Sequence, residues 1–181
     1  MSAFLRRQLA DYVEYHRDPM NCALHVVGIV ILFLGAVLPL SLWPVTLFGL
    51  QINVGVISAA PVLIYWILLD VPIGLAIAAA AALLLFTGAA IASHASVTVV
   101  WAISIVLILI GVALQIIGHQ VFERRQPALM DNPPHLLLGP VFVMAKLFIS
   151  LGFRDDLAAI IQKGPNSVYQ HQSQGGVQQD R

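Results

Sequence analysis

Long apolar runs separated by short polar breaks make up most of the chain. Between Pro19 and Phe122 the only Asp, Glu, Lys or Arg is Asp70. Four runs in this stretch each approach the ~20 residues that a helix needs to cross the hydrocarbon core of a bilayer. The pattern therefore predicts an all-α bundle with four transmembrane spans. The expected spans are about Cys22–Leu42, Ile52–Leu69, Val71–Ala92 and Val97–Gly118.

Short connections join the four expected spans. Leu42–Gln51 carries a tryptophan, a proline and a glycine, which is typical of a turn at a membrane interface. Asp70 stands immediately before Val71 and Pro72. Because a proline disfavours helix at the residue before it, we expect a tight hairpin there with Asp70 as its cap. A small polar turn around His94 links the third and fourth spans.

The chain changes character after the fourth span. His135–Phe153 is apolar but includes Lys146 and Pro140, so we expect an interfacial or re-entrant helix there. A fifth span is the alternative, and the cost of placing a lysine in hydrocarbon argues against it. Residues 164–181 are rich in Gln, Gly and Ser and are expected to be disordered. Residues 1–163 then form a single membrane-embedded domain.

Basic residues flank the apolar region on both sides. An even number of spans places both groups on one side of the membrane, and the positive-inside rule makes that side cytoplasmic. Both termini are therefore expected in the cytoplasm, and the compact chain suggests a bacterial inner membrane. The basic residues include Arg6, Arg7 and Arg17 before the spans and Arg124, Arg125, Lys146, Arg154 and Lys163 after them.

Composition narrows the class of protein. Charged residues make up 10% of the chain and apolar residues 59%, whereas an ordinary soluble domain is about 25% charged. The mean hydropathy is +0.88. These values exclude a soluble globular domain and a disordered chain. Nine basic residues balance nine acidic ones, which excludes a nucleic-acid binder. The single cysteine, Cys22, excludes a disulfide framework and a thiolate metal cluster.

Four histidines stand at or beside the ends of the expected spans. His16 and His25 are nine residues apart, which on one straight helix would place them on opposite faces. Pro19 lies between them and breaks the helix, so the two rings can converge. His119 ends the fourth span at the same membrane face. His94 falls on the opposite face in this topology.

Polar residues accompany two of these histidines. Gln115, His119 and Glu123 recur every four residues and form one polar stripe on an apolar helix. Asn21 and His25 share a helix face through the same spacing. Asn21 is also the expected N-cap of the first span.

The histidine group is a candidate metal site. Three imidazoles with a carboxylate suit Fe(II) or Zn(II), and Gly118 leaves room beside His119 for a helix or a ligand. The alternative is that each histidine is a solvated interfacial residue or bonds a neighbouring helix. Spacing does not decide between them, because the chain has no HxxxH or HExxH unit. Glu123 likewise either supports the site or forms a salt-bridge cluster with Arg124 and Arg125.

Two motifs in these regions resemble a known family. The first is Tyr15-His16 followed by Pro19, Asn21 and His25, and the second is Gln115-x-x-Gly118-His119-x-x-Phe122-Glu123 followed by Pro127-Ala128-Leu129 and Asp131-Asn132. They are similar to motifs of the membrane 2-hydroxy-fatty-acid dioxygenases of yeast phytosphingosine breakdown and their bacterial relatives. The resemblance runs from about Leu9 to Leu157.

The resemblance implies an iron(II)-dependent enzyme that shortens a 2-hydroxy fatty acid by one carbon with O₂ and releases CO₂. It implies that His16, His25 and His119 are ligands of Fe(2+), and that His94, which matches a histidine of the longer members, is a further ligand. Lys146 departs from the family pattern, because relatives usually carry Glu there.

Polar neighbours are assigned to the same site. Under this reading Glu123 or Gln115 orients His119 from outside the metal shell, and Asn21 belongs to the catalytic group. The expected partners are a 2-hydroxy fatty acid, O₂ and membrane lipids, with no nucleic acid. The oligomeric state does not follow from the sequence.

Other functions stay open at the level of sequence. A non-catalytic membrane scaffold or small transporter would need no metal. A haem protein would use paired histidines, and a zinc-dependent lipid hydrolase would share the same ligands. Metal analysis separates these readings.

Overall fold

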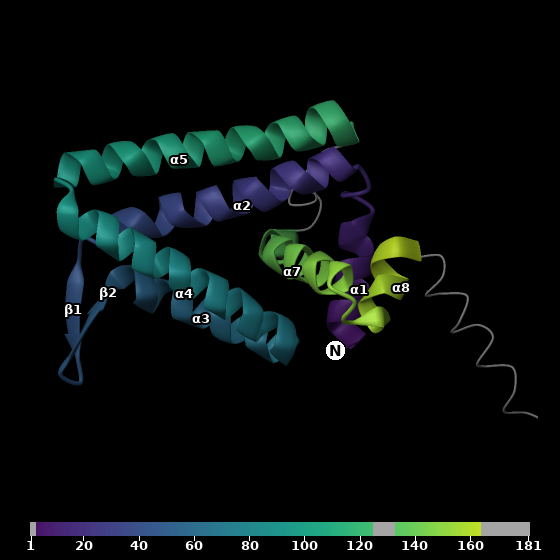
Figure 1. Cartoon of the computed structure of the whole chain (residues 1–181), viewed down its shortest axis with the longest axis horizontal. Coiled ribbons are helices and arrows are strands. Elements are labelled where there is room, and N and C mark those ends of the chain that lie inside the picture. The colour runs from purple at the N-terminus through teal and green to yellow at the C-terminus, as the bar shows by residue number, and fades with distance from the viewer. Residues whose placement is uncertain (1–2, 125–132, 164–181) are drawn as a thin grey trace, which may run out of the picture.

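The computed structural model describes residues 3–124 and 133–163, most of which are helical (Figure 1). The predicted tail at residues 164–181 lies outside the described residues. In chain order the elements are α1 (Ala3–Val13), α2 (Pro19–Leu40), β1 (Pro44–Leu47), β2 (Leu50–Asn53), α3 (Val54–Leu69), α4 (Val71–His94), α5 (Val97–Ile117), a π-helix (Gly118–Glu123), a 3-10 helix (Pro133–Leu137), α7 (Gly139–Ser150) and α8 (Asp155–Lys163).

The four long helices alternate in direction and form two neighbouring pairs. Helix α2 packs along α5, and α3 packs along α4, while α2 also contacts α4 (Figure 1). The start of α2, the α3–α4 turn and the end of α5 lie at one end of the bundle. The predicted order of four apolar helices is therefore confirmed, and the all-α class with it.

Span length differs from the prediction at one helix. Within the described residues, three helices are long and apolar enough to cross a membrane, Pro19–Leu40, Val71–His94 and Val97–Glu123, and a bent helix pair after residue 134 would make a fourth if it is one span. Helix α3 has only 16 residues, so it rises ~24 Å against a hydrocarbon core of ~30 Å. It is short because Asn53 caps it, accepting the backbone N–H of Val56 at 3.0 Å.

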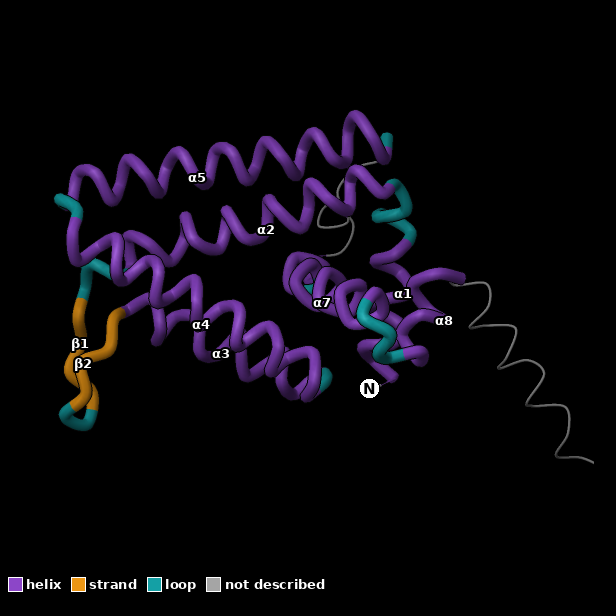
Figure 2. The backbone as a smooth tube through the Cα atoms, viewed as in Figure 1, coloured by secondary structure: helices purple, strands orange, loops and turns teal. Residues whose placement is uncertain are grey.

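The connection between α2 and α3 is a β-hairpin and not the simple turn that we expected (Figure 2). Strands β1 and β2 pair antiparallel, with Pro44 opposite Asn53 and Leu47 opposite Leu50. Phe48 and Gly49 both have positive φ, at 51° and 80°, as a two-residue hairpin turn requires. The apolar pattern of this segment did not reveal the strands, because it continues the hydrophobic run of the flanking helices.

The predicted apolar segment after the fourth span forms two helices, α7 and α8, whose sharp bend fits either a re-entrant helix or a broken span. Helix α7 has 12 residues and rises ~18 Å, too short to span the bilayer. It contacts α2 and α4, and the chain then bends by 118° into α8. Lys146 is held within the protein, where its Nζ donates to Cys22 Sγ at 3.0 Å and lies 5.0 Å from the centre of the Phe142 ring.

Carboxylates cap two of the long helices. Asp18, and not the predicted Asn21, is the N-cap of α2, because the helix begins at Pro19 and the Asp18 side chain accepts from the backbone N–H of Met20 and Asn21. Asp70 caps α4 as predicted and accepts from Ile73 N–H at 3.3 Å.

A hydrophobic core ties the short helices to the end of the bundle where α2 begins. It joins side chains of α1, α7 and α8 to the facing ends of α3 and α4. Along α5, by contrast, large apolar side chains such as Leu109 (64% exposed) point outward, as expected of a surface that faces lipid. The largest fully buried apolar side chains of this core are Leu5, Leu9, Ile73, Leu138, Phe142, Leu157 and Ile160.

Candidate metal centre

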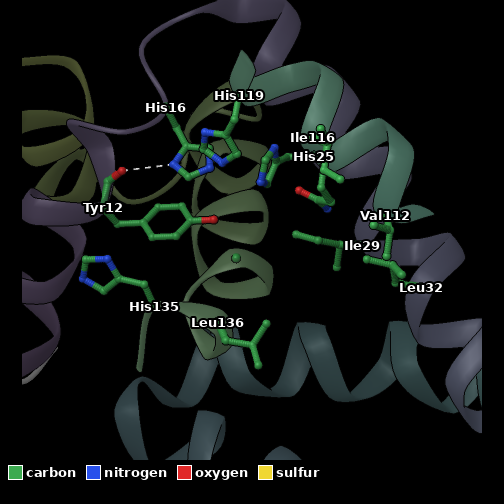
Figure 3. Close-up of a pocket in the computed structure, with 12 residues that line it drawn as sticks. Tyr12, His16, His25, Ile29, Leu32, Val112, Ile116, His119, His135 and Leu136 are labelled. Atoms are coloured by element: carbon green, nitrogen blue, oxygen red, sulfur yellow. Dashed lines mark hydrogen bonds between the residues drawn. The ribbon is translucent and has the colours of Figure 1, made fainter. Parts of the chain in front are cut away.

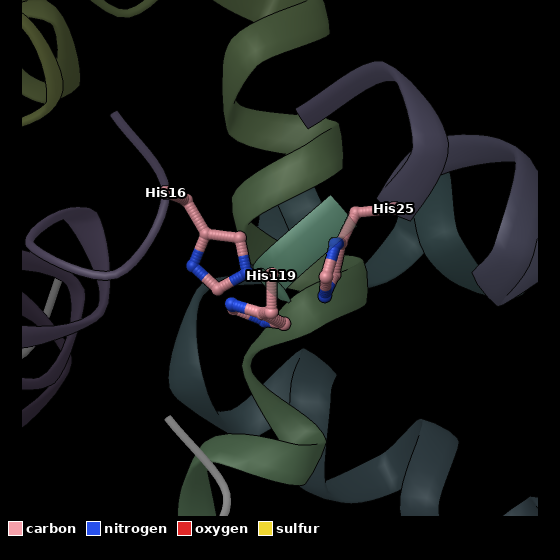
Figure 4. A group of neighbouring side chains, drawn as sticks. All are labelled: His16, His25 and His119. Carbon is pink, nitrogen blue, oxygen red and sulfur yellow. The ribbon is translucent and has the colours of Figure 1, made fainter. Parts of the chain in front are cut away.

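Three histidines from distant parts of the chain meet at this end of the bundle (Figure 4). His16 lies between α1 and α2, His25 lies in α2, and His119 lies in the π-helix after α5. One ring nitrogen from each lies within 4.8 Å of the others. All three rings are buried, at 3%, 7% and 2% exposed respectively. The predicted convergence of these three histidines is therefore present in the structure.

The break before α2 brings His16 back against His25. Helix α1 ends at Val13, and three backbone hydrogen bonds, to Asp11, Tyr12 and Val13 carbonyls, curl the chain into a turn. The His16 ring stacks on the Tyr12 ring, with centroids 4.1 Å apart and planes 10° apart. Its centroid then lies 4.5 Å from that of His25.

Hydrogen bonds fix the tautomers of two of the rings. His16 Nδ1–H donates to the Tyr12 carbonyl oxygen at 3.1 Å, so Nε2 carries the lone pair. Asn21 uses its amide nitrogen to donate to Glu123 and to the Tyr15 carbonyl. Its Oδ1 is therefore the acceptor for His25 Nδ1–H, at 3.1 Å, and His25 also presents Nε2. A metal-binding histidine typically donates its other ring N–H in this way.

Glu123 connects the π-helix to the start of α2. Its two carboxylate oxygens accept from the backbone N–H groups of Arg17 and Asp18 and from Asn21 Nδ2, each at 3.0 Å. Since Asn21 in turn accepts from His25, the carboxylate supports the ring orientation of His25 through one intervening amide. The sequence had linked Glu123 to His119, which is on its own helix.

Gly118 allows α2 and the π-helix to approach one another. A Cβ at this position would overlap with Asn21 Oδ1, the atom that accepts from His25. A π-helical turn widens the backbone and is frequent at functional sites. Here it follows directly on α5 and carries His119 into the group.

Buried ring nitrogens are left over within the group. His16 Nε2 and His119 Nδ1 have no hydrogen-bond partner among the described residues. A buried polar atom without a partner costs about 1–3 kcal/mol, and such atoms call for a ligand as their explanation. Burial, reinforced by the nearby His25, lowers the pKa of His16 to about 3, so this ring is neutral at physiological pH and its lone pair is available to a metal.

A cavity of about 340 Å³ opens beside the three rings (Figure 3). Its volume is within the ~300–1,000 Å³ of ordinary small-molecule sites. The histidines form one end of it, apolar side chains of α2 and α5 form another part, and α1, the 3-10 helix and the start of α7 complete the wall. The lining residues are Tyr12, His16, His25, Ile29, Leu32, Val112, Gln115, Ile116, His119, His135, Leu136 and Gly139.

Two residues in the cavity wall were missed from the sequence. Tyr12 is not among the site residues expected from the sequence, yet it is 4% exposed and its hydroxyl points into the cavity (Figure 3). Burial raises the pKa of the Tyr12 phenol, so it keeps its proton. His135 was expected to be interfacial and is instead buried against Tyr12.

A spacing rule could have identified Tyr12. It precedes His16 by four residues, just as Asn21 precedes His25 and Gln115 precedes His119. Each histidine thus has a polar residue one helical turn before it.

The fourth predicted ligand lies elsewhere. His94 is exposed and ends α4, where the chain turns into α5. The 21 residues of α5 separate it from His119 by ~30 Å. The structure therefore does not bring His94 to the other three histidines.

Comparison with known proteins bears on this arrangement. A family model described as "2-hydroxy-palmitic acid dioxygenase Mpo1-like" matches residues 2–151. The chain is 34% identical to the 2-hydroxy-palmitic acid dioxygenase MPO1 of Saccharomyces cerevisiae over 160 residues, covering 87% of each chain. Among solved structures, none matches this chain.

Proposed function

Since the chain belongs to the Mpo1-like family, we propose that it is a 2-hydroxy fatty acid dioxygenase that uses Fe(II) held by His16, His25 and His119. The observation that carries the proposal is the group of three buried imidazoles beside an apolar cavity. The reaction converts a 2-hydroxy acid and one O₂ into the acid one carbon shorter, CO₂ and water. Atoms and electrons balance without an external reductant.

The donor set fits a ferrous ion. All three ligands offer neutral nitrogen, which suits Fe and Zn, and the cavity borders the group so that further coordination positions face substrate. When bound, ferrous iron supplies the activation of O₂ and a Lewis acid for the carboxylate and α-oxygen of the substrate.

Residues around the histidines fix the orientation of the rings. The Tyr12 carbonyl fixes His16, and Asn21 fixes His25. Glu123 fastens Asn21 and the backbone before α2. These groups orient the ligands and do not themselves reach the cavity, so Asn21 and Glu123 are positioning residues.

Gln115 and Tyr12 face the reacting end of the substrate. Both line the cavity next to the histidines, and each can donate a hydrogen bond, from an amide N–H₂ or a phenol O–H. A 2-hydroxy acid offers three oxygens at its head as acceptors. We assign these two side chains to the binding and orientation of the head group.

The apolar wall sets the direction of the fatty acid. Leu32 lies seven residues beyond His25, and Val112 lies seven residues before His119, so both lie ~10 Å deeper in the bundle. The tail then points from the histidines toward the bilayer centre, while the head stays at the membrane surface. A fatty acid dissolved in one leaflet has this same orientation.

The site lies at the end of the bundle that carries the basic residues. Arg6, Arg7, Arg17 and Arg154 all belong to segments at this end. By the positive-inside rule we place this end on the cytoplasmic side, and we assign the protein to a bacterial inner membrane.

An assay with a labelled substrate tests the reaction. The purified protein is given 2-hydroxyhexadecanoate carrying ¹³C at the carboxyl carbon. We expect pentadecanoate, ¹³CO₂ and consumption of one O₂ per turnover. Chelation should abolish the activity, and Fe(II) but not Zn(II) should restore it. A scaffold or transporter would give no product, a zinc hydrolase would give no O₂ uptake, and a haem protein would show a Soret band.

A further inference from the structure

A second apolar cavity of about 100 Å³ lies beside the first. It is lined by side chains of α2, α4 and α7 together with Trp66 of α3, and all of its lining residues are apolar. Val26 and Val30 on its rim are 39% and 45% exposed, so it opens toward lipid. The lining residues are Val26, Ile29, Val30, Phe33, Trp66, Ile77, Ala80, Ala81, Leu84, Pro140, Val143 and Met144.

The two cavities adjoin each other at Ile29 and at the start of α7. Ile29 lines both of them, while Gly139 lines the first and the adjacent Pro140 lines the second. A Cβ at Gly139 would lie 2.8 Å from Ile29 Cδ1, so this methyl group fills the gap in front of the α7 backbone. Cδ1 is the free end of a flexible side chain, so Ile29 can move without a shift of the backbone.

The straight route along α2 and α5 is closed. A Cβ at Gly111 would overlap with the Leu32 side chain, and one at Gly35 would lie 3.0–3.2 Å from Leu107 and Ile108. The two helices are therefore packed against each other immediately below the first cavity. That cavity extends ~10 Å below the histidines, whereas the tail of a membrane lipid spans roughly half of the ~30 Å hydrocarbon core, about 15 Å.

We propose that the groove between α2, α4 and α7 is the binding site for the distal part of the substrate's alkyl tail, and that Ile29 controls the passage into it. The inference rests on the proposed function. The head and first methylenes occupy the cavity beside the histidines, and the remainder passes Ile29 and lies against α4 and α7. The groove therefore selects long-chain over short-chain 2-hydroxy acids.

Neighbouring alanines of α4 provide a matched test. Ala80 lines the groove, whereas Ala79 is also exposed but does not. Ala80→Phe should lower kcat/KM for 2-hydroxyhexadecanoate by about tenfold through steric overlap. It should leave 2-hydroxyoctanoate within about twofold, because a short tail ends before the groove. Ala79→Phe should leave both substrates unchanged. Val143→Phe narrows the same groove from α7 and replaces Ala80→Phe if that variant does not fold.

A photoreactive substrate reports the position of the alkyl tail directly. We expect 2-hydroxyhexadecanoate with a diazirine near its methyl end to label α4 and α7, and labelling there should fall in Ala80→Phe but not in Ala79→Phe. The proposal would be overturned if Ala80→Phe lowered kcat/KM equally for both substrates or left the ratio between them unchanged. It would also be overturned if labelling were confined to the lipid face of α5. A wild-type protein that processes neither acid would refute the proposed function instead, while the position of the label would still decide the location of the tail.

Discussion

At the scale of single residues, His16 and His25 owe their orientation to hydrogen bonds with neighbouring groups outside the proposed metal site. The Tyr12 carbonyl and the Asn21 amide each accept an Nδ1–H and leave Nε2 directed at the centre of the group. By accepting from the Asn21 amide nitrogen, Glu123 fixes the orientation of the amide in which its oxygen is the acceptor for His25. Loss of such supports typically lowers metal affinity 10–100-fold.

Glu123→Gln should lower iron affinity by about tenfold. The amide replaces a carboxylate that accepts three N–H groups, two from the backbone before α2 and one from Asn21, so at least one bond is lost. Iron content after dialysis against a graded chelator measures the change. Glu14→Gln is the control, because Glu14 pairs with Arg17 at the surface. Equal affinity in both variants would contradict the role assigned to Glu123.

Tyr12→Phe should retain iron and bind the substrate more weakly. The variant keeps the aromatic ring on His16 and the backbone carbonyl that accepts from it, and it removes only the hydroxyl in the cavity. We expect KM for 2-hydroxyhexadecanoate to rise by about five- to tenfold, in line with the loss of one hydrogen bond of ~1 kcal/mol. If iron occupancy falls instead, Tyr12 supports the ligands and does not contact the substrate.

At the scale of elements, an ion pair fastens α8 to the turn between α3 and α4. Arg154 donates to both carboxylate oxygens of Asp70, at 2.8 and 3.0 Å, and also to Asp156. The Asp70 side chain is only 3% exposed.

Asp70→Asn should destabilise the protein by roughly 3–5 kcal/mol at neutral pH, as expected when one partner of a buried pair is removed. Burial alone raises the pKa of Asp70, but hydrogen bonds from Arg154 and from Ile73 N–H outweigh it and hold the pKa below its ordinary value of 3.8. The stabilisation is therefore present above pH 3.8 and is lost as the pH falls through the depressed pKa.

Thermal unfolding in detergent across this pH range measures the effect. The difference in Tm between wild type and Asp70→Asn should shrink as the pH falls below 3.8. Asp156→Asn is the control and should have a much smaller effect, because its side chain is 45% exposed. A difference that is constant down to acid pH would show that the ion pair is not its source.

The sequence predicts some elements well because hydrophobic runs and proline breaks act locally. The four long helices and the convergence of His16 with His25 across Pro19 follow from such signals. The β-hairpin and the early start of α2 do not, since an apolar run does not separate strand from helix and several polar residues compete to cap α2. His135 was missed because it meets Tyr12 through the packing of α1 against the segment before α7, which no local spacing encodes.

At the scale of the whole molecule, the alternation of α2 to α5 places the histidines and the β-hairpin at opposite ends of the bundle. The basic segments share the end with the histidines. The hairpin carries no charged residue, and Phe48 at its tip is 97% exposed. The two ends of the bundle therefore differ: one carries the histidines and the basic segments, and the other carries an uncharged hairpin.

Thiol labelling in intact cells tests this topology. In a Cys22→Ala background, Gln51→Cys on the hairpin should react with a membrane-impermeant maleimide from outside the cell. Gln8→Cys in α1 should react only after the membrane is permeabilised, because it lies at the histidine end. Labelling of both positions from the same side would exclude an odd number of crossings between them.

The most direct test of the metal centre is iron analysis of the purified protein and its histidine variants. We predict one iron per chain in the wild type and in His94→Ala, whose side chain lies at the far end of the bundle. His16→Ala, His25→Ala and His119→Ala should each lose the metal while remaining folded. A wild-type protein without iron, or iron that is retained in all three variants, would contradict the account.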